Sequence, residues 1–361
     1  MTDPIELPLI DLTSSDLDAA GKAMLDAAVG FGFLYIDSRT TVFSSTDVDR
    51  TFGMAEQFFK LPLSDKVPYR RGSDNRISDP GALNREEISK SGFITKVIVQ
   101  ESVLICRHRA LNIGELQDEK IQQPLPESLM SREADIATFI SLCNKTCDQI
   151  LRLLARGLEV ADDFFASRHD PAKGSTGNSL RLLYYPAAVS SYRPDKDIRA
   201  GAHSDYGSIT LLFQRPGQPG LEILTTDQKW APVPVYPSDK ADFPFPPILV
   251  NIGDMLSYWT DGLLKSTIHR VVFPHDKQSI AKPTPQDRYS IAFFCQPVGS
   301  TELVPVPSKV IAAHRHKKQD TDPNAIVGYG GGASGLSIDQ HRLTAGEHLQ
   351  SRLAATYITT K

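Results

Sequence analysis

A histidine and an aspartate stand two positions apart in the segment AGAHSDYGSITLLFQ, as His203 and Asp205. If this segment is an extended strand, alternate side chains project from the same face, and the imidazole and the carboxylate lie a few ångströms apart. Such a pair can share one metal cation. The spacing alone is weak evidence, because a chain with nine histidines is expected to contain one such pair by chance.

A metal site also needs a third ligand, and His269 in the β-rich segment KSTIHRVVF is the candidate. Two histidines and one carboxylate on one face of an octahedron leave the opposite positions open, an arrangement that is diagnostic of non-haem Fe(II) oxygenases. In the competing interpretation, His203 lies at the surface and His269 is a hydrogen-bonded residue of the core. Spacing by itself favours this second interpretation.

A second pair of polar residues, Arg288 and Ser290, lies in the segment DRYSIAFF. On a strand they face the same side, which continues through Ala292 and Phe294. A guanidinium on an apolar strand face is costly to bury without an anionic partner, and an arginine beside a hydroxyl suits a carboxylate. The pattern predicts a carboxylate-binding site, unless Arg288 lies on an edge strand in water. Phe294 either lines a substrate pocket or belongs to the core.

The elements that must position these residues change in character along the chain. The first part mixes short strands with amphipathic helices, and helices are expected within 14–32, 45–66 and 131–160. After a Gly/Ser-rich boundary at PAKGSTGNS, short β-rich runs separated by Pro/Gly turns predict a barrel or a jelly-roll sandwich. These runs are 179–186, 207–214, 220–226, 248–259, 266–273 and 288–297, and a helix is expected at 345–357.

Composition excludes several classes of protein. The chain has 361 residues, 40% of them hydrophobic, and a formal net charge of −4. No run of basic residues predicts binding to nucleic acid or to an anionic membrane, and neither a secretory signal nor a bilayer-spanning stretch is recognised.

The four cysteines form no CxxC pair, so Cys143 and Cys147 are expected to be buried small hydrophobes. A cytoplasmic location is expected, and His169 is expected at the surface.

The order of these segments resembles the isopenicillin N synthase-like family of 2-oxoglutarate- and Fe(II)-dependent dioxygenases. The matching segments span nearly the whole chain, from LPLIDL and GFGFLYID near the start to GEHLQSRLAATY near the end. The most specific of them are HSDYGSITLLFQ, ILVNIGDMLSYWTDGLLKSTIHRVVF and DRYSIAFF. The resemblance implies a mainly β fold with flanking helices, in which the core is a double-stranded β-helix, or jelly roll.

The resemblance also implies how the chain is divided. Residues 5–115 would form the N-terminal segment of the dioxygenase family, and residues 175–300 the double-stranded β-helix that binds Fe(II) and 2-oxoglutarate. Residues 301–361 would form a loop and a helix packed on the barrel. Two stretches, 231–247 and 274–287, look like insertions that lie near the barrel mouth or decorate the surface.

Roles for individual residues follow from the same resemblance. The residues that match the iron ligands, and hence the catalytic centre, are His203, Asp205 and His269. The residues that match the binding site for the distal carboxylate of 2-oxoglutarate are Arg288, Ser290 and Tyr185. Leu183 stands where many relatives have an asparagine, which puts one polar contact to the cosubstrate in doubt.

The implied reaction couples the oxidative decarboxylation of 2-oxoglutarate, with Fe(II) and O2, to C–H oxidation of a small metabolite. Hydroxylation is the default outcome, with desaturation or ring rearrangement as alternatives, in secondary metabolite biosynthesis. One rival is an isopenicillin N synthase-like oxidase that uses no 2-oxoglutarate and keeps the Arg/Ser pair for the carboxylate of its own substrate. Another is a non-catalytic barrel module, which the retention of all three ligands disfavours. The substrate and the oligomeric state do not follow from the sequence.

Overall fold

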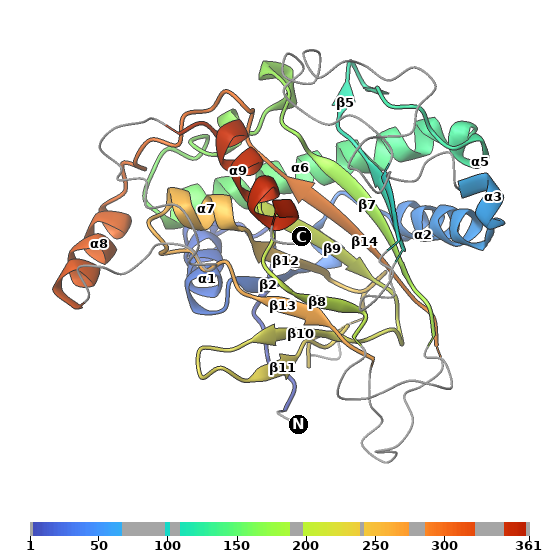
Figure 1. Ribbon diagram of the computed structural model, residues 1–361. Helices are drawn as coiled ribbons and strands as arrows, with labels where there is room; N and C mark the ends of the chain where they lie inside the picture. Colours follow the sequence, from blue (N-terminus) through green and yellow to red (C-terminus); the bar gives the residue numbers. More distant parts are fainter. Residues whose placement is uncertain are drawn as a thin grey trace.

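The computed structural model describes residues 3–66, 98–101, 109–187, 198–238, 242–273, 286–321 and 343–358. Most of its strands belong to two sheets (Figure 1). The larger sheet has, in spatial order, β1 (Leu9–Ile10), β2 (Phe33–Ile36), β12 (Ile248–Ile252), β9 (Ile209–Gln214), β14 (Arg288–Cys295), β7 (Ser179–Tyr185), β4 (Arg109–Ile113) and β3 (Ile98–Glu101). The smaller sheet has β11 (Trp230–Pro232), β10 (Leu221–Leu224), β13 (His269–Val271) and β8 (Ala200–His203). A separate hairpin joins β5 (Leu116–Gln117) to β6 (Lys120–Ile121).

The two sheets enclose a cavity, and strands of both line it. Pairing within the larger sheet is antiparallel except between β1 and β2, and the strands before residue 115 extend the sheet formed by β7, β9, β12 and β14. This arrangement confirms the expected fold, a jelly roll of mainly β structure with flanking helices. Strand β12 is buried along its whole length, because both faces of the larger sheet are covered.

Helices cover the face of the larger sheet that lies away from the cavity. In Figure 1, α1 (Leu17–Gly30), α2 (Ser45–Lys60) and α6 (Glu133–Gly157) lie behind this sheet. The remaining helices are α3 (Leu63–Lys66), α5 (Glu127–Met130), α7 (Asp254–Trp259), α8 (Lys309–Thr321) and α9 (Ala345–Ile358), with single 3₁₀ turns at η1 (Ser38–Thr40), η3 (Ala166–Arg168) and η4 (Pro171–Lys173).

Strand β14 shows how the sheet separates core from cavity. Tyr289, Ile291 and Phe293 join the hydrophobic cluster under the helices. The alternate residues of the same strand, from Arg288 through Ser290 to Phe294, line the cavity. This two-residue alternation is what places polar site residues within a strand whose other face is apolar.

One predicted β-rich run is wrong in its second half. The segment 248–259 is a strand only as far as Ile252, and a helix begins at Asp254. Between them, a Cβ on Gly253 would lie only 2.2 Å from the carbonyl oxygen of Gly207. The glycine therefore lets the chain turn against the loop that follows β8, a contact that no local pattern reveals.

Most of the first suspected insertion, 231–247, belongs to the described residues, whereas most of the second, 274–287, does not. The described part of 231–247 packs against the N-terminal segment, where Ser38 Oγ donates to the Phe245 carbonyl at 2.7 Å and Val235 is buried. No described residue of this stretch lines the cavity. In the second stretch, 274–285 lie outside the described residues.

The cysteine expectation is confirmed, since Cys143 and Cys147 are free and buried in α6. Within the described part of the chain, no helix combines the length and the apolar character needed to span a bilayer.

Helices α1 and α6 are in close contact at two glycines, Gly21 and Gly157. A Cβ on Gly157 would lie 2.4 Å from the carbonyl oxygen of Gly21, which is backbone and cannot move aside as a side chain can. A Cβ on Gly53, in the middle of α2, would meet no atom within 4 Å. Gly157 and Gly53 thus differ in the space around them, although both occupy a helical backbone conformation that alanine favours.

We therefore predict opposite effects of two identical substitutions. Gly157→Ala should lower the free energy of unfolding by about 1–3 kcal/mol, because the added methyl forces α1 and α6 apart. Gly53→Ala should raise it by roughly 0.5–1 kcal/mol through helix propensity. Denaturant unfolding of both variants tests this, and equal effects would contradict the proposed close contact.

Candidate metal centre

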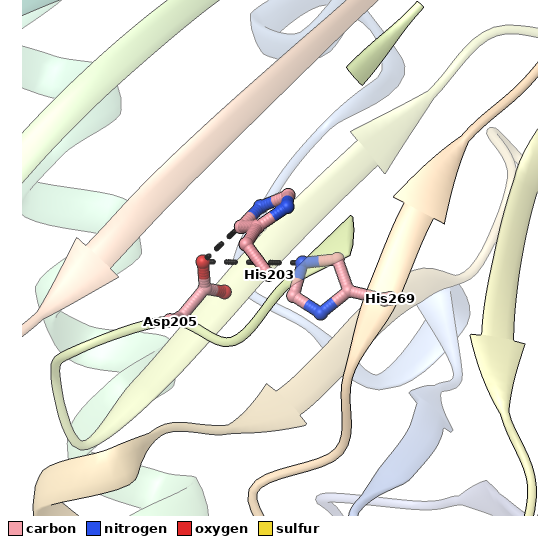
Figure 2. Close-up of side chains that lie close together, drawn as sticks. All are labelled: His203, Asp205 and His269. Atoms are coloured by element: carbon pink, nitrogen blue, oxygen red, sulfur yellow. Dashed lines mark ion pairs between the residues drawn. The ribbon is translucent and has the colours of Figure 1, made fainter. Parts of the chain in front are cut away.

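The structure brings together the three residues whose chemistry suggested a metal site. Ligand atoms of His203, Asp205 and His269 all lie within 4.8 Å of one another. Asp205 Oδ1 is 4.0 Å from His203 Nε2 and 3.9 Å from His269 Nε2. In Figure 2 the three side chains point toward one another, His203 and Asp205 from one segment and His269 from another.

Strand pairing accounts for the two imidazoles, and a loop accounts for the carboxylate. His269 in β13 stands directly opposite His203 in β8, and their ring centroids are 4.3 Å apart. Strand β8 ends at His203, so Asp205 belongs to the loop before β9. The assumption of one extended strand through both residues is therefore wrong, although the two side chains do converge.

Hydrogen bonds to the outer atoms turn the three ligand atoms inward. The Nδ1 atoms of His203 and His269 donate to the carbonyl oxygens of Gly201 and Thr267, at 2.7 and 3.2 Å. In a neutral imidazole this bond places the proton on Nδ1 and leaves Nε2 as the nitrogen that can bind a metal. The Oδ2 atom of Asp205 is also hydrogen-bonded, but as an acceptor.

Two neutral donors take up Oδ2 of Asp205. Thr210 Oγ1 donates to it at 2.7 Å and Asn251 Nδ2 at 2.8 Å. Oδ1 is the oxygen that faces both imidazoles. Burial alone would raise the pKa of Asp205, but His269, His203 and the two donors together lower it. Burial, reinforced by His203, lowers the pKa of His269 to about 4, so this imidazole is neutral near pH 7.

The first turn of α7 holds the loop that carries Asp205. The backbone N–H of Gly253 donates to the Ser208 carbonyl at 2.9 Å, and that of Asp254 donates to the Asp205 carbonyl at 2.7 Å. Helix-terminal N–H groups that lack partners within the helix are therefore satisfied by this loop. The contact joins the end of β12 to the proposed ligand segment.

The Asp254 side chain connects both ligand-bearing segments to the C-terminal helix. Its carboxylate accepts from Ser266 Oγ at 2.6 Å and from Ser204 Oγ at 3.1 Å, and it forms an ion pair with Arg352 of α9. Ser204 is adjacent to both His203 and Asp205, and Ser266 lies three residues before His269. One buried carboxylate thus fixes the relative position of the two segments.

His169 is not at the surface, contrary to the expectation from its polar sequence context. It is buried, and its ring nitrogens bond to the Phe165 carbonyl and to Ser208 Oγ, each at 2.8 Å. Burial lowers its pKa to about 4. The residue therefore supports the Asp205–Ser208 loop from the side of the core.

Arg288 is also buried, with an exposed fraction of 1%. Its guanidinium donates to Ser290 Oγ at 3.2 Å, to the Gln218 carbonyl at 3.2 Å and to Gln214 Oε1 at 3.5 Å. It also contacts Tyr185, its cross-strand neighbour, whose ring centroid lies 5.1 Å from Cζ. Burial lowers the pKa of the guanidinium, and Tyr185 opposes this effect.

These contacts leave the charge of Arg288 without a counterion. No acidic side chain of the described ranges forms an ion pair with it. The nearby Gln214 Nε2 is buried and has no hydrogen-bond partner. A buried cation beside an unsatisfied donor fits a carboxylate ligand.

One cavity of about 360 Å³ contains both ends of the site. The three metal-site residues line it together with Arg288, Ser290 and Tyr185. Leu183 and Phe294 also line it, and Phe294 packs against a hydrophobic cluster of the core as well. Sequence reasoning missed Arg181, which lines the same cavity and was hidden in the apolar run SLRLLYY.

The donor set suits ferrous iron and a chelating oxo acid. Two imidazoles and one carboxylate, with inward atoms fixed by neighbours, match the ligands preferred by non-haem iron. Arg288 and Ser290, which line the same cavity, offer donors to a second carboxylate there. Such a site can hold a metal and an anionic cosubstrate together.

Comparison with known proteins gives the same picture. Residues 176–297 match the family model of the 2OG-Fe(II) oxygenase superfamily. Residues 7–122 match the model described as non-haem dioxygenase in morphine synthesis N-terminal.

Similar chains cover most of the sequence. A UPF0676 protein of Schizosaccharomyces pombe is 32% identical over 306 residues, which are 84% of this chain and 85% of the relative. The 2-oxoglutarate-dependent dioxygenase htyE of Aspergillus rugulosus is 28% identical over 318 residues, 87% of this chain and 89% of the relative. A full-length Neurospora crassa protein, whose crystal structure contains alpha-KG and thymine, has 26% identity and a TM-score of 0.70, and the match covers 99% of both chains.

The cavity with its His/Asp/His cluster, the matched family models and the extent of these similarities agree. This chain belongs to the 2OG-Fe(II) oxygenase superfamily and is a dioxygenase that depends on Fe(II), 2-oxoglutarate and O2.

Proposed function

We propose that this oxygenase hydroxylates a C–H bond of a small metabolite, as a step in secondary metabolite biosynthesis. The observation that carries the proposal is that the His/Asp/His cluster and the unpaired charge of Arg288 open on one cavity. Hydroxylation is chosen over desaturation and ring rearrangement because it requires the removal of only one hydrogen from the substrate.

In this proposal the two groups of residues have separate tasks. His203, Asp205 and His269 hold the iron through the atoms that face one another. Arg288 and Ser290 bind the distal carboxylate of 2-oxoglutarate, with Tyr185 beside the guanidinium. When bound, ferrous iron with 2-oxoglutarate and O2 supplies the oxidant for C–H cleavage.

The overall reaction balances without a further reductant. The substrate R–H, 2-oxoglutarate and O2 give R–OH, succinate and CO2. One oxygen atom enters the product and the other enters succinate. Of the four electrons that O2 takes up, two come from the decarboxylation of 2-oxoglutarate and two from the C–H bond of the substrate. The protein contributes orientation and exclusion of water, and the apolar side chains of Leu183, Leu212 and Val271 in the cavity wall serve the latter.

The test follows from this balance. Anaerobic protein loaded with Fe(II) and 2-oxoglutarate should show a visible charge-transfer band, and candidate metabolites are screened for faster decay of this band in air. Product and succinate should then form in equal amounts. Product without succinate would instead support the oxidase that uses no 2-oxoglutarate.

Removal of one proposed ligand should abolish turnover. We predict that His203→Ala lowers Fe(II) affinity and product formation by more than about a hundredfold, because two protein ligands hold the ion poorly. The matched control is His316→Ala, an exposed histidine of α8 that should leave both quantities unchanged. An unchanged product yield from His203→Ala would show that the metal assignment is wrong.

Arg288 should act on the cosubstrate and not on the metal. Loss of a charged hydrogen-bonding partner costs about 1.5–3 kcal/mol, so Arg288→Gln should raise the Kd of 2-oxoglutarate roughly 10–100-fold. Arg288→Lys keeps the charge without the planar fork and should show a smaller increase. Fe(II) affinity, measured separately, should not change, and normal 2-oxoglutarate binding by Arg288→Gln would refute the role.

A further inference from the structure

The C-terminal helix carries an arginine that is connected to the metal cluster through another residue. Arg352 of α9 forms an ion pair with Asp254, the first residue of α7. The Asp254 side chain is 5% exposed and that of Arg352 is 25% exposed. Salt and water screen such a partly buried pair less than a surface pair, so the contact can hold the carboxylate in one position.

Asp254 contacts both segments that carry the proposed ligands. Its Oδ1 accepts from Ser266 Oγ at 2.6 Å, and its Oδ2 accepts from Ser204 Oγ at 3.1 Å. The Arg352 guanidinium donates to the same Oδ2 atom. The backbone N–H of Asp254 donates to the Asp205 carbonyl at 2.7 Å. The arginine therefore fixes the oxygen atom on which the serine between two proposed ligands depends.

Arg352 also contacts the ligand loop directly. Its Cζ lies 5.4 Å from the centroid of the Tyr206 ring. Tyr206 follows Asp205 in the chain and lines the cavity. One guanidinium thus contacts this loop at two points, at residue 204 through Asp254 and at residue 206 through the ring.

The start of α9 is held in place without Arg352. Backbone N–H groups of Ala345 and Gly346 donate to carbonyl oxygens of the loop after β14, each at 2.9 Å. The buried His348 ring lies 5.4 Å from the ring of Tyr258 in α7. A change at Arg352 can therefore remove the contact with Asp254 while the helix stays in place. Its effect on the metal is then separable from unfolding of the helix.

Loss of the arginine would leave Asp254 without its charged partner. Within the described ranges, no other cationic side chain forms an ion pair with Asp254. A buried carboxylate that loses its counterion is costly, so this side chain should turn toward water. Ser204 and Ser266 would then lose their common acceptor, and the two ligand-bearing segments could move relative to each other.

We propose that Arg352 is a positioning residue for the metal centre, which acts through Asp254, and that metal binding and the packing of α9 strengthen each other. A bound metal holds the ligand-bearing segments together, and their two serines then fix the carboxylate to which Arg352 binds. Such a coupling free energy is the same in both directions. This inference rests on the proposed function, because it takes the His/Asp/His cluster as the metal site.

The test measures Fe(II) binding to the full-length protein without O2, by competition with a chromogenic chelator. Arg352→Gln should raise the Kd of Fe(II) roughly 5–150-fold, the range typical of coupled sites. Arg352→Lys keeps the charge and should recover part of the affinity. The control is Arg315→Gln, because Arg315 of α8 pairs with Asp261 just after the other end of α7. This variant should stay within about twofold of the parent Kd.

Asp254→Asn tests whether the arginine acts through this carboxylate. In the Asp254→Asn background, Arg352→Gln should change the Kd of Fe(II) by less than about twofold, because the contact has already been removed. An independent structural effect would appear in full in both backgrounds. In the parent, Fe(II) should also slow amide hydrogen exchange across 345–353, and Arg352→Gln should weaken this slowing.

Several results would overturn this role. They are an unchanged Fe(II) Kd in Arg352→Gln, an equal loss in Arg315→Gln, or a loss that persists in full in the Asp254→Asn background. Exchange across 345–353 that does not respond to Fe(II) would overturn the mutual coupling.

Two further outcomes separate this role from folding and from the proposed function. If Arg352→Gln does not fold, Arg352→Lys and Asp254→Asn are measured instead, and parent-like Fe(II) affinity in both would overturn the role. Absence of Fe(II) binding by the parent protein would overturn the proposed function, and this role with it. Normal binding by the parent with an unchanged Kd in the variants overturns the role of Arg352 alone.

Discussion

The contact between the first turn of α7 and the Asp205–Ser208 loop is the interaction on which the site depends. Backbone N–H groups of Gly253 and Asp254 bind carbonyls of this loop, and a Cβ on Gly253 would collide with it. The Asp254 carboxylate then binds serines beside the ligand-bearing positions of β8 and β13. One tight backbone contact and one buried carboxylate therefore set the geometry of three side chains that belong to two segments distant in the sequence.

The larger sheet divides the molecule into a part that stabilises it and a part that performs chemistry. Alternation along β7, β9 and β14 sends one set of side chains into the core beneath α6 and the other set into the cavity. The core side is almost wholly apolar, whereas the cavity side contains two arginines, Arg181 and Arg288, that donate to neutral polar neighbours. A buried charge such as that of Arg288 is costly without an anionic partner, and 2-oxoglutarate bound as proposed would supply one.

The C-terminal helix is also connected to this arrangement. Arg352 of α9 forms an ion pair with Asp254, the carboxylate that joins the two ligand-bearing segments, and its guanidinium lies 5.4 Å from the ring of Tyr206 in the cavity wall. Helix α9 lies beside α7 in Figure 1, on the opposite side of the larger sheet from α6. The ends of the chain thus take part in shaping the barrel: the N-terminal strands extend its sheet, and the C-terminal helix is fastened next to the proposed ligands.

The sequence by itself determined the family, the jelly-roll class and the residue types of the site, because the motifs around His203, His269 and Arg288 are local and specific. It also determined the strand alternation that brings Ser290 and Phe294 to the cavity with Arg288. Only the tertiary structure decided that Asp205 reaches the cluster from a loop, that His169 is buried behind this loop, and that Arg181 faces the cavity. These outcomes depend on contacts between segments far apart in the chain, and the period of a single segment contains no information about what lies across from it.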